Sequence, residues 1–240
     1  LMFVTRNGIV KKTMFNAYDS SRQAGLIAIN LREGDELVRV MPTSPEDEIM
    51  VISESGQGIR FLESDIRPTG RTASGVRGMR LKANDAVVGA DSIAAASELS
   101  DQVADHEGAD SEAADPVETL RLLTITDGGY GKRTELGEFS RQRRGGQGVR
   151  AHKIHAARGR VVTGFLVGED DHLLMINDAG VVIRTKVSTI SIQGRTASGV
   201  RVMNLDGESK VAAVARVLTG PDSEDPEDSE ELEDAADAVE

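Results

Sequence analysis

Arginine and glycine recur together at four places in the sequence, and this pairing could bind phosphate. Residues 70–77 and 194–201 both read GRTASGVR, and residues 144–150 keep the same outline as RGGQGVR. A fourth copy, RQAGLI at residues 22–27, is one residue shorter and lacks the final arginine. Glycine allows a close backbone approach to a ligand, and arginine presents a flat cationic fork that matches a phosphate. The four loops therefore favour an anion-binding role.

A second marker lies upstream of each loop. Gly8, Gly56, Gly129 and Gly180 each follow an apolar run and precede a basic residue by four positions. The distance from this glycine to the last glycine of the loop is 17 residues in the first copy and 19 in the other three. Two markers in register indicate an internal repeat of about 45–50 residues, which is typical of propeller-like folds.

If each repeat unit places its basic residues at one edge, together they would form a ring of phosphate contacts. For a single loop the plainer interpretation is stronger: the glycine makes a turn and the arginine is solvated. Recurrence in a fixed register favours binding instead, with contacts to the phosphate backbone of a nucleic acid rather than to base edges. The candidate residues are Lys12, Arg22, Arg60, Arg71, Arg77, Lys132, Arg133, Gln142, Arg143, Arg144, Gly145, Gly146, Gly148, Arg150, Arg184, Arg195 and Arg201.

The formal net charge of −12 conceals a basic body with two acidic segments. Residues 91–118 carry 9 acidic residues and residues 221–240 carry 11, and neither segment has a lysine or an arginine. The rest of the chain has a net charge of +8. This separation predicts a polyanionic partner for the body. The alternative is an ordinary solvated surface with unrelated acidic linkers.

The elements that must position these loops are short strands. We expect an all-β fold with units at residues 2–44, 47–90, 119–168 and 170–218, each of about four strands joined by glycine-rich turns. Within them, residues 26–31, 75–81 and 86–90 each read as a strand. Such small sheets would stack side by side around an axis. We expect residues 1–218 to form this domain, residues 91–118 to be an irregular acidic insert and residues 219–240 to be an acidic tail.

The composition excludes several kinds of function. The sequence contains no cysteine and only four histidines, without a metal-binding motif, so we expect no disulfide, metal or cofactor. No stretch approaches the length of an apolar membrane span and no signal-peptide layout is present, so we expect a protein of the cytoplasm with no membrane partner. The chain begins Leu1-Met2, which favours a fragment of a longer translation product.

The run QRRGGQG at residues 142–148 resembles the signature box of the C-terminal domain family of DNA gyrase A subunits, in which QRRGG is followed by a variable residue and glycine. The runs at residues 7–13, 129–134 and 190–200 also resemble that family, and the likeness spans roughly residues 1–218. The family box usually lies in the first blade, whereas its best match here lies in the third visible unit.

This resemblance implies a β-pinwheel, a relative of the propeller in which neighbouring blades exchange strands, with four blades visible in this chain. It implies that a basic rim bends and wraps double-stranded DNA and so enables ATP-dependent negative supercoiling. The partners would be DNA, the rest of the gyrase A subunit and the B subunit, in the nucleoid region of the cytoplasm. This domain alone would not catalyse a reaction.

Two other interpretations remain. One is the equivalent domain of topoisomerase IV, whose units tend to lack a clear box. The other is a propeller-like scaffold for protein interactions, which would not need a basic residue at the same register in every unit.

Overall fold

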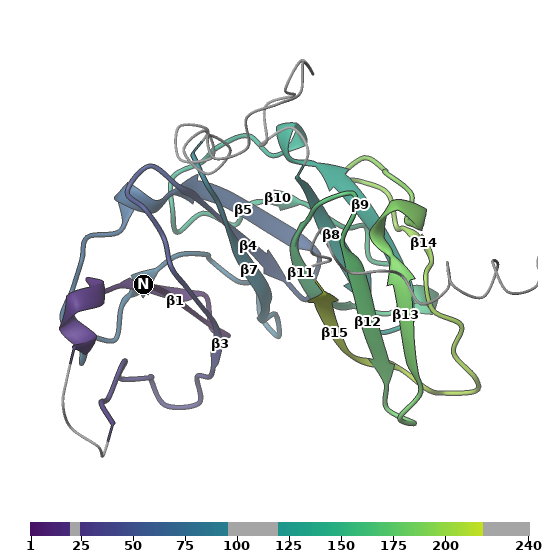
Figure 1. Ribbon diagram of the computed structural model, residues 1–240, viewed down its shortest axis with the longest axis horizontal. Coiled ribbons are helices and arrows are strands. Elements are labelled where there is room, and N and C mark those ends of the chain that lie inside the picture. The colour runs from purple at the N-terminus through teal and green to yellow at the C-terminus, as the bar shows by residue number, and fades with distance from the viewer. Residues whose placement is uncertain (20–24, 96–119, 218–240) are drawn as a thin grey trace, which may run out of the picture.

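The computed structural model describes residues 1–19, 25–95 and 120–217, which form four small antiparallel sheets in succession along an arc (Figure 1). In this part of the chain the remaining regular structure consists of short 3₁₀ turns. The all-β, propeller-like architecture expected from the repeat is confirmed. The 3₁₀ turns are η1 (Phe15–Tyr18), η2 (Glu63–Asp65), η3 (Leu136–Glu138), η4 (Ala156–Arg158) and η5 (Val187–Thr189).

The first three sheets have four strands each. The first has the order β3 (Leu37–Met41), β1 (Met2–Thr5), β2 (Ile9–Lys12) and β6 (Val76–Arg77). The second has the order β7 (Val87–Ile93), β4 (Glu48–Ser53), β5 (Gln57–Leu62) and β10 (Val149–Arg150). The third has the order β11 (Val161–Val167), β8 (Arg121–Thr126), β9 (Tyr130–Glu135) and β14 (Val200–Arg201).

The fourth sheet has three strands among the described residues. Its order is β15 (Val211–Val217), β12 (His172–Asn177) and β13 (Val182–Lys186). Strands β3, β7, β11 and β15 form one edge of each sheet and pack against one another in that order. The opposite edges, which end in β6, β10 and β14, therefore lie on the outer side of the arc.

Each outer strand comes from the next unit along the chain. Strand β6 of the second unit pairs with β2, β10 of the third pairs with β5, and β14 of the fourth pairs with β9. This is the exchange of strands that the resemblance implies. The exchange means that the glycine loops, which lead directly into these two-residue strands, lie at the joints between units.

The sheets pack face to face, and each interior sheet separates two hydrophobic cores. In β4, Ile49 and Val51 face the first core, while Met50 and Ile52 face the second. A strand that is buried on both faces reads as a continuous apolar run. This explains why residues 48–53 read EIMVIS without alternation.

Three strand predictions need correction. Residues 26–31 form no strand, because no neighbouring strand pairs with them in the described structure. The strand expected at 75–81 is reduced to Val76–Arg77, since only these residues reach the ladder of the preceding unit. The strand expected at 86–90 continues to Ile93, so the first residues assigned to the acidic insert belong to β7. Most of that insert and the acidic tail lie outside the described residues.

Candidate nucleic-acid interface

The glycine loops contact one another in sequence along the outer side of the arc. In the last three loops, the arginine four residues before the last glycine donates from Nη1 to a carbonyl oxygen two residues beyond the last glycine of the preceding loop. These bonds run from Arg71 to Ile27 (3.3 Å), from Arg144 to Arg77 (3.1 Å) and from Arg195 to Arg150 (3.1 Å). The four loops therefore form a single continuous row, which we call the loop edge (residues 25–27, 70–77, 143–150 and 194–201).

Several cations of the loop edge point to solvent. Arg77, Arg143, Arg150 and Arg201 are exposed, as is Arg144, while Arg71 and Arg195 are half-buried. Arg77, Arg150 and Arg201 occupy the same position in their loops, two residues after the last glycine. Three guanidinium groups at equivalent positions on successive joints could contact successive phosphates of one duplex.

Tyr130 and Arg158 support the last of these arginines, and the sequence predictions missed both. Arg201 Nη2 donates to Tyr130 Oη at 3.0 Å, and the Arg158 guanidinium lies 4.6 Å from the centre of the same ring. Arg158 Nη1 also donates to the carbonyl oxygen of Gly199 at 2.9 Å. These contacts fix the fourth loop and its terminal arginine in one orientation.

A buried lysine lies beneath each of the two identical loops. Lys132 Nζ donates to the carbonyl oxygens of Gly194 (2.5 Å) and Arg195 (2.9 Å). Lys11 Nζ donates to the carbonyl oxygens of Ala28 (2.5 Å) and Arg71. At the equivalent position under the third loop the residue is Ile59, whose Cδ1 lies 3.5 Å from the position that a Cβ on Gly146 would take. A lysine therefore lies beneath the two loops with the sequence GRTASGVR, and an isoleucine lies beneath the loop with the sequence RGGQGVR.

Lys132 was predicted to contact nucleic acid, and this prediction is wrong because its side chain is completely buried. Lys11 was not predicted at all. The sequence does contain a pattern that could have indicated Lys11, because Lys11 and Lys132 both follow the upstream glycine of their unit by three residues. Both lysines donate to carbonyl oxygens of the loops and so fix the conformation of the loops. They therefore affect the exposed arginines indirectly, by holding the loop backbone in place.

We expect Lys132 to make the free energy of unfolding depend on pH in the alkaline range. Burial lowers the pKa of Lys132 to about 8, below the usual value of about 10.4 that it regains on unfolding. Between these values the unfolded chain binds the proton and the folded chain does not, so the unfolding free energy should rise with pH, by up to about 3 kcal/mol. Urea denaturation at several pH values measures this rise. Lys132→Met should reduce it and leave the contribution of Lys11, whose pKa burial also lowers; an identical pH dependence in both proteins would contradict the assignment.

Three of the four basic residues that follow the upstream glycine by four positions turn inward. Lys12 Nζ donates to Glu63 Oε2 at 2.6 Å, and Arg60 bonds to Glu48 and, at 3.0 Å, to the carbonyl oxygen of Leu136. Glu63 lies in η2 and Leu136 in η3, and both turns belong to the next unit. These cations therefore hold the joints together from within.

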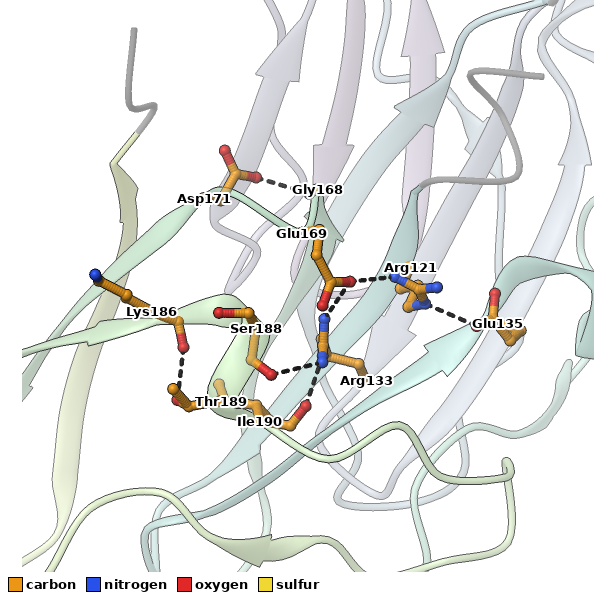
Figure 2. A network of polar contacts seen from close by, with 10 residues as sticks. All are labelled: Arg121, Arg133, Glu135, Gly168, Glu169, Asp171, Lys186, Ser188, Thr189 and Ile190. Carbon is orange, nitrogen blue, oxygen red and sulfur yellow. Dashed lines mark hydrogen bonds and ion pairs between the residues drawn. The ribbon is translucent and has the colours of Figure 1, made fainter. Parts of the chain in front are cut away.

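Arg133 shows the same arrangement in most detail (Figure 2). Its guanidinium donates to the carbonyl oxygens of Ile190 (2.6 Å) and Ser188 (2.9 Å) and to Glu169 (2.7 Å), which also accepts from Arg121 at 2.5 Å. The bond from Arg133 lowers the pKa of the Glu169 carboxyl. With 4% of its surface exposed, Arg133 cannot reach a duplex.

The predicted rim position is thus wrong for Lys12, Arg60 and Arg133. The physical reason is that constant spacing reveals which residues are equivalent but does not reveal the side of the strand on which a neighbouring unit will pack. Arg184, the fourth of this set, is exposed and donates from Nε to His172 Nδ1 at 2.8 Å. Arg22 lies outside the described residues.

The box-like run at residues 142–148 builds the joint between the second and third units. The backbone N–H of Gln142 donates to the carbonyl oxygen of Arg60 at 2.7 Å, and that of Gly145 to the carbonyl oxygen of Gly78 at 2.5 Å. The carbonyl oxygen of Gly146 accepts from the backbone N–H of Arg80 at 2.8 Å. Gly148 has a φ of 73°, and a Cβ there would lie 2.3 Å from the carbonyl oxygen of Gly58. These residues position Arg143, Arg144 and Arg150.

Residues 1–19, 25–95 and 120–217 contain no cluster of three or more histidine, aspartate or glutamate side chains that could hold a metal ion. Among the same residues, no helix has the length and apolar character needed to cross a membrane.

Comparison with known proteins identifies the family. The family described as DNA gyrase C-terminal domain, beta-propeller, matches residues 1–44, 47–94, 121–166 and 171–217. The DNA gyrase A subunit of Mycolicibacterium smegmatis is 38% identical over 90% of this chain, and that of Klebsiella oxytoca is 39% identical over 94%. In both cases this chain spans 23% of the relative's length.

Solved structures show the same fold. The C-terminal domain of DNA topoisomerase IV superposes with a TM-score of 0.76 at 26% identity, over 90% of this chain and 61% of that domain. A DNA gyrase A C-terminal domain superposes with a TM-score of 0.73 at 25% identity, over 90% of this chain and 65% of that one. With its repeat, its exchanged strands and its similarity to gyrase A subunits, the chain belongs to the DNA gyrase C-terminal domain family.

Proposed function

We propose that this protein binds double-stranded DNA along the loop edge and bends it around the outer side of the arc. The observation that carries the proposal is the chain of bonds from Arg71, Arg144 and Arg195 to the preceding loops, which joins the separate glycine loops into one curved row. Arg77, Arg150 and Arg201 would contact the DNA backbone from this row. Backbone contacts position a duplex without reading its sequence, so sequence preference would come from the ease of bending.

Bending requires several joints to act together. Bending about 20–30 base pairs by about 40–90° costs roughly 1–6 kcal/mol. A single arginine–phosphate contact contributes about 1.5–3 kcal/mol, so one loop could bind DNA but could not also bend it far. Contacts from three successive joints could offset the cost of bending. A continuous row of loops therefore supports wrapping rather than simple attachment.

In the cell, we propose that the domain serves a DNA gyrase A subunit in the cytoplasm. It would present wrapped DNA to the rest of the A subunit and to the B subunit, which would carry out DNA cleavage and ATP hydrolysis and so produce negative supercoils. A topoisomerase IV-type domain is the second candidate, favoured by the superposition on that domain. The similarity of the sequence to gyrase A subunits favours the first.

The topology of ligated circles tests the wrap. Nicked circular DNA is mixed with the protein at low salt, sealed with ligase, stripped of protein and separated by gel electrophoresis. A wrap of constant handedness should shift the linking number in one direction, in proportion to the amount of protein, and the shift should vanish at high salt because phosphate contacts release counterions. Tight binding without any shift in linking number would contradict wrapping and leave only attachment.

The acidic tail, residues 219–240, should weaken DNA binding. Its 11 acidic side chains could occupy the loop edge in competition with DNA. Deleting residues 219–240 should therefore tighten binding at low salt and have little effect at high salt, where charge interactions are screened. Fluorescence anisotropy with a labelled duplex measures the change, and equal affinities for the two proteins at low salt would refute the competition. A tail of the same length with each acidic residue replaced by the matching amide is the control for chain length.

A further inference from the structure

A cavity beside the loop edge is lined by cations from two units. It has a volume of about 290 Å³ and lies at the joint between the second and third units. Ser55 and Gln57 line it from the hairpin of β4 and β5, and Lys82 lines it from the residues before β7. Arg150 of β10 and Lys153, three residues further along the chain, come from the third unit. We call this cavity the basic hollow.

None of the described carboxylates lines the basic hollow. Asp85 is bonded to Ser55, but both of its oxygens are already engaged: Oδ2 accepts from Ser55 Oγ at 2.6 Å, and Oδ1 accepts from the Ser55 N–H at 2.8 Å. Lys82, Arg150 and Lys153 are exposed and form no ion pair with another described residue. Cations that lie together without an anion repel one another. An anionic ligand would therefore stabilise this arrangement.

The joint between the third and fourth units has an equivalent cavity with a different charge. Its volume is about 320 Å³, and Arg201 lines it at the position that Arg150 holds in the basic hollow. Asp127 and Glu208 also line it, and Asp127 Oδ2 accepts from Lys210 Nζ at 3.0 Å. The same joint can thus be built with carboxylates around the cavity. Packing of the units does not explain why the basic hollow has only cations.

We infer that the basic hollow binds a phosphate group through the ammonium groups of Lys82 and Lys153 and the guanidinium group of Arg150. Lysine binds phosphate as a point charge, and arginine adds two parallel hydrogen bonds. The volume of the hollow lies just below the range of ordinary small-molecule pockets, about 300–1,000 Å³. The hollow therefore suits one or two phosphate groups rather than a larger organic anion.

Two sources could supply this phosphate group. One is free phosphate or pyrophosphate from solvent. The other is the backbone of a duplex on the loop edge, because Arg150 belongs both to the loop edge and to the basic hollow. This second source rests on the proposed function. It would give the duplex an additional contact at the joint between the second and third units that the next joint, with its two carboxylates, does not offer.

The distribution of exposed lysines allows a test within one sample. Lys82 and Lys153 line the basic hollow, whereas Lys186 in β13 and Lys210 beside the equivalent cavity are exposed elsewhere. The full chain is treated with an amine-acylating reagent alone, with pyrophosphate, or with a short duplex, and mass spectrometry measures the modification of each lysine. Acylation requires the neutral amine, so a bound phosphate that raises the amine pKa by about one unit slows the reaction about tenfold.

Pyrophosphate should slow the acylation of Lys82 and Lys153 about tenfold and leave Lys186 and Lys210 nearly unchanged. Stronger protection of Lys82 and Lys153 than of Lys210 by the duplex would support a DNA phosphate as the occupant. Protection by pyrophosphate, but not by a duplex that fluorescence anisotropy shows to be bound, would overturn DNA as the source and leave the loop edge as the DNA site. If no duplex binds, the proposed function fails, and the pyrophosphate result still decides whether the hollow binds phosphate.

A pair of variants with equal charge tests the same site by phosphorus-31 NMR. The pyrophosphate resonance should broaden with the unmodified chain and with the double variant Arg39→Gln and Arg216→Gln, which removes two charges from the inner strands β3 and β15. It should not broaden with Lys82→Gln combined with Lys153→Gln. Equal broadening by both double variants, or equal slowing of acylation at all four exposed lysines, would overturn the inference, because the anion would then follow overall charge. Circular dichroism establishes that each variant is folded.

Discussion

Replacing Arg77, Arg150 and Arg201 together by glutamine should weaken DNA binding about 10²–10³-fold at moderate salt, since each lost arginine–phosphate contact removes about 1.5 kcal/mol or a little less. These three side chains are exposed and hold the same position in successive loops. The slope of log affinity against log salt should also become shallower by about 3, because about one counterion is released per phosphate contact. Fluorescence anisotropy over a range of salt concentrations measures both quantities.

The matched control removes three positive charges elsewhere. Arg39 and Arg216 belong to the inner strands β3 and β15, and Arg160 directly precedes the inner strand β11. Glutamine at these three positions gives the same net charge and should leave the salt slope nearly unchanged. If the two triple variants lost the same affinity, binding would follow the overall charge and the loop edge would not be the site. If neither variant lost affinity, a scaffold for protein interactions would be the better interpretation.

The second large effect is expected at the glycines of the joints. Gly148→Ala should lower the unfolding free energy by about 3–5 kcal/mol, because it combines an unfavourable positive φ with a backbone collision that must shift the ladder. The Cβ would lie 2.3 Å from the carbonyl oxygen of Gly58. Urea denaturation followed by circular dichroism measures the loss.

Gly25→Ala separates the cost of the positive φ from the cost of the backbone collision. Gly25 has nearly the same φ, 75° against 73°, but an added Cβ would meet nothing within 4 Å. This variant should therefore lose only the conformational cost of about 1–2 kcal/mol. Equal losses for the two variants would mean that backbone conformation alone matters and that the joint tolerates the added atom.

The repeat and its hairpins could be predicted because they depend on local signals. Each unit was expected to contain about four short strands joined by glycine-rich turns, and the hairpins β4–β5 and β8–β9 have this form. The two markers in constant register indicated that the units are equivalent. The predicted loops do form one row, since equivalent positions in a repeat occupy equivalent places on each unit.

What the residues alone could not show is where the neighbouring unit packs. Arg133 and Arg150 both recur in register, yet Arg133 is enclosed by η5 of the next unit and Arg150 is exposed. The exchanged strands are two residues long, too short to carry an alternating pattern, so residues 75–81 were read as one long strand. Residues 26–31 show the converse: a sequence suited to a strand forms none where no partner edge is available.

The most direct test of the proposal that the loop edge binds one bent duplex is to map which part of the duplex each loop contacts. Single cysteines at Ser74, Gln147 and Ser198, each just before the last glycine of its loop, can carry a reagent that generates hydroxyl radicals and cleaves nearby DNA. With a duplex of defined position, the three variants should cleave at three separate centres, in the order of the loops and at regular intervals. Cleavage by all three at one centre, or in an order unrelated to that of the loops, would contradict the proposal that the loop edge guides a single bent duplex.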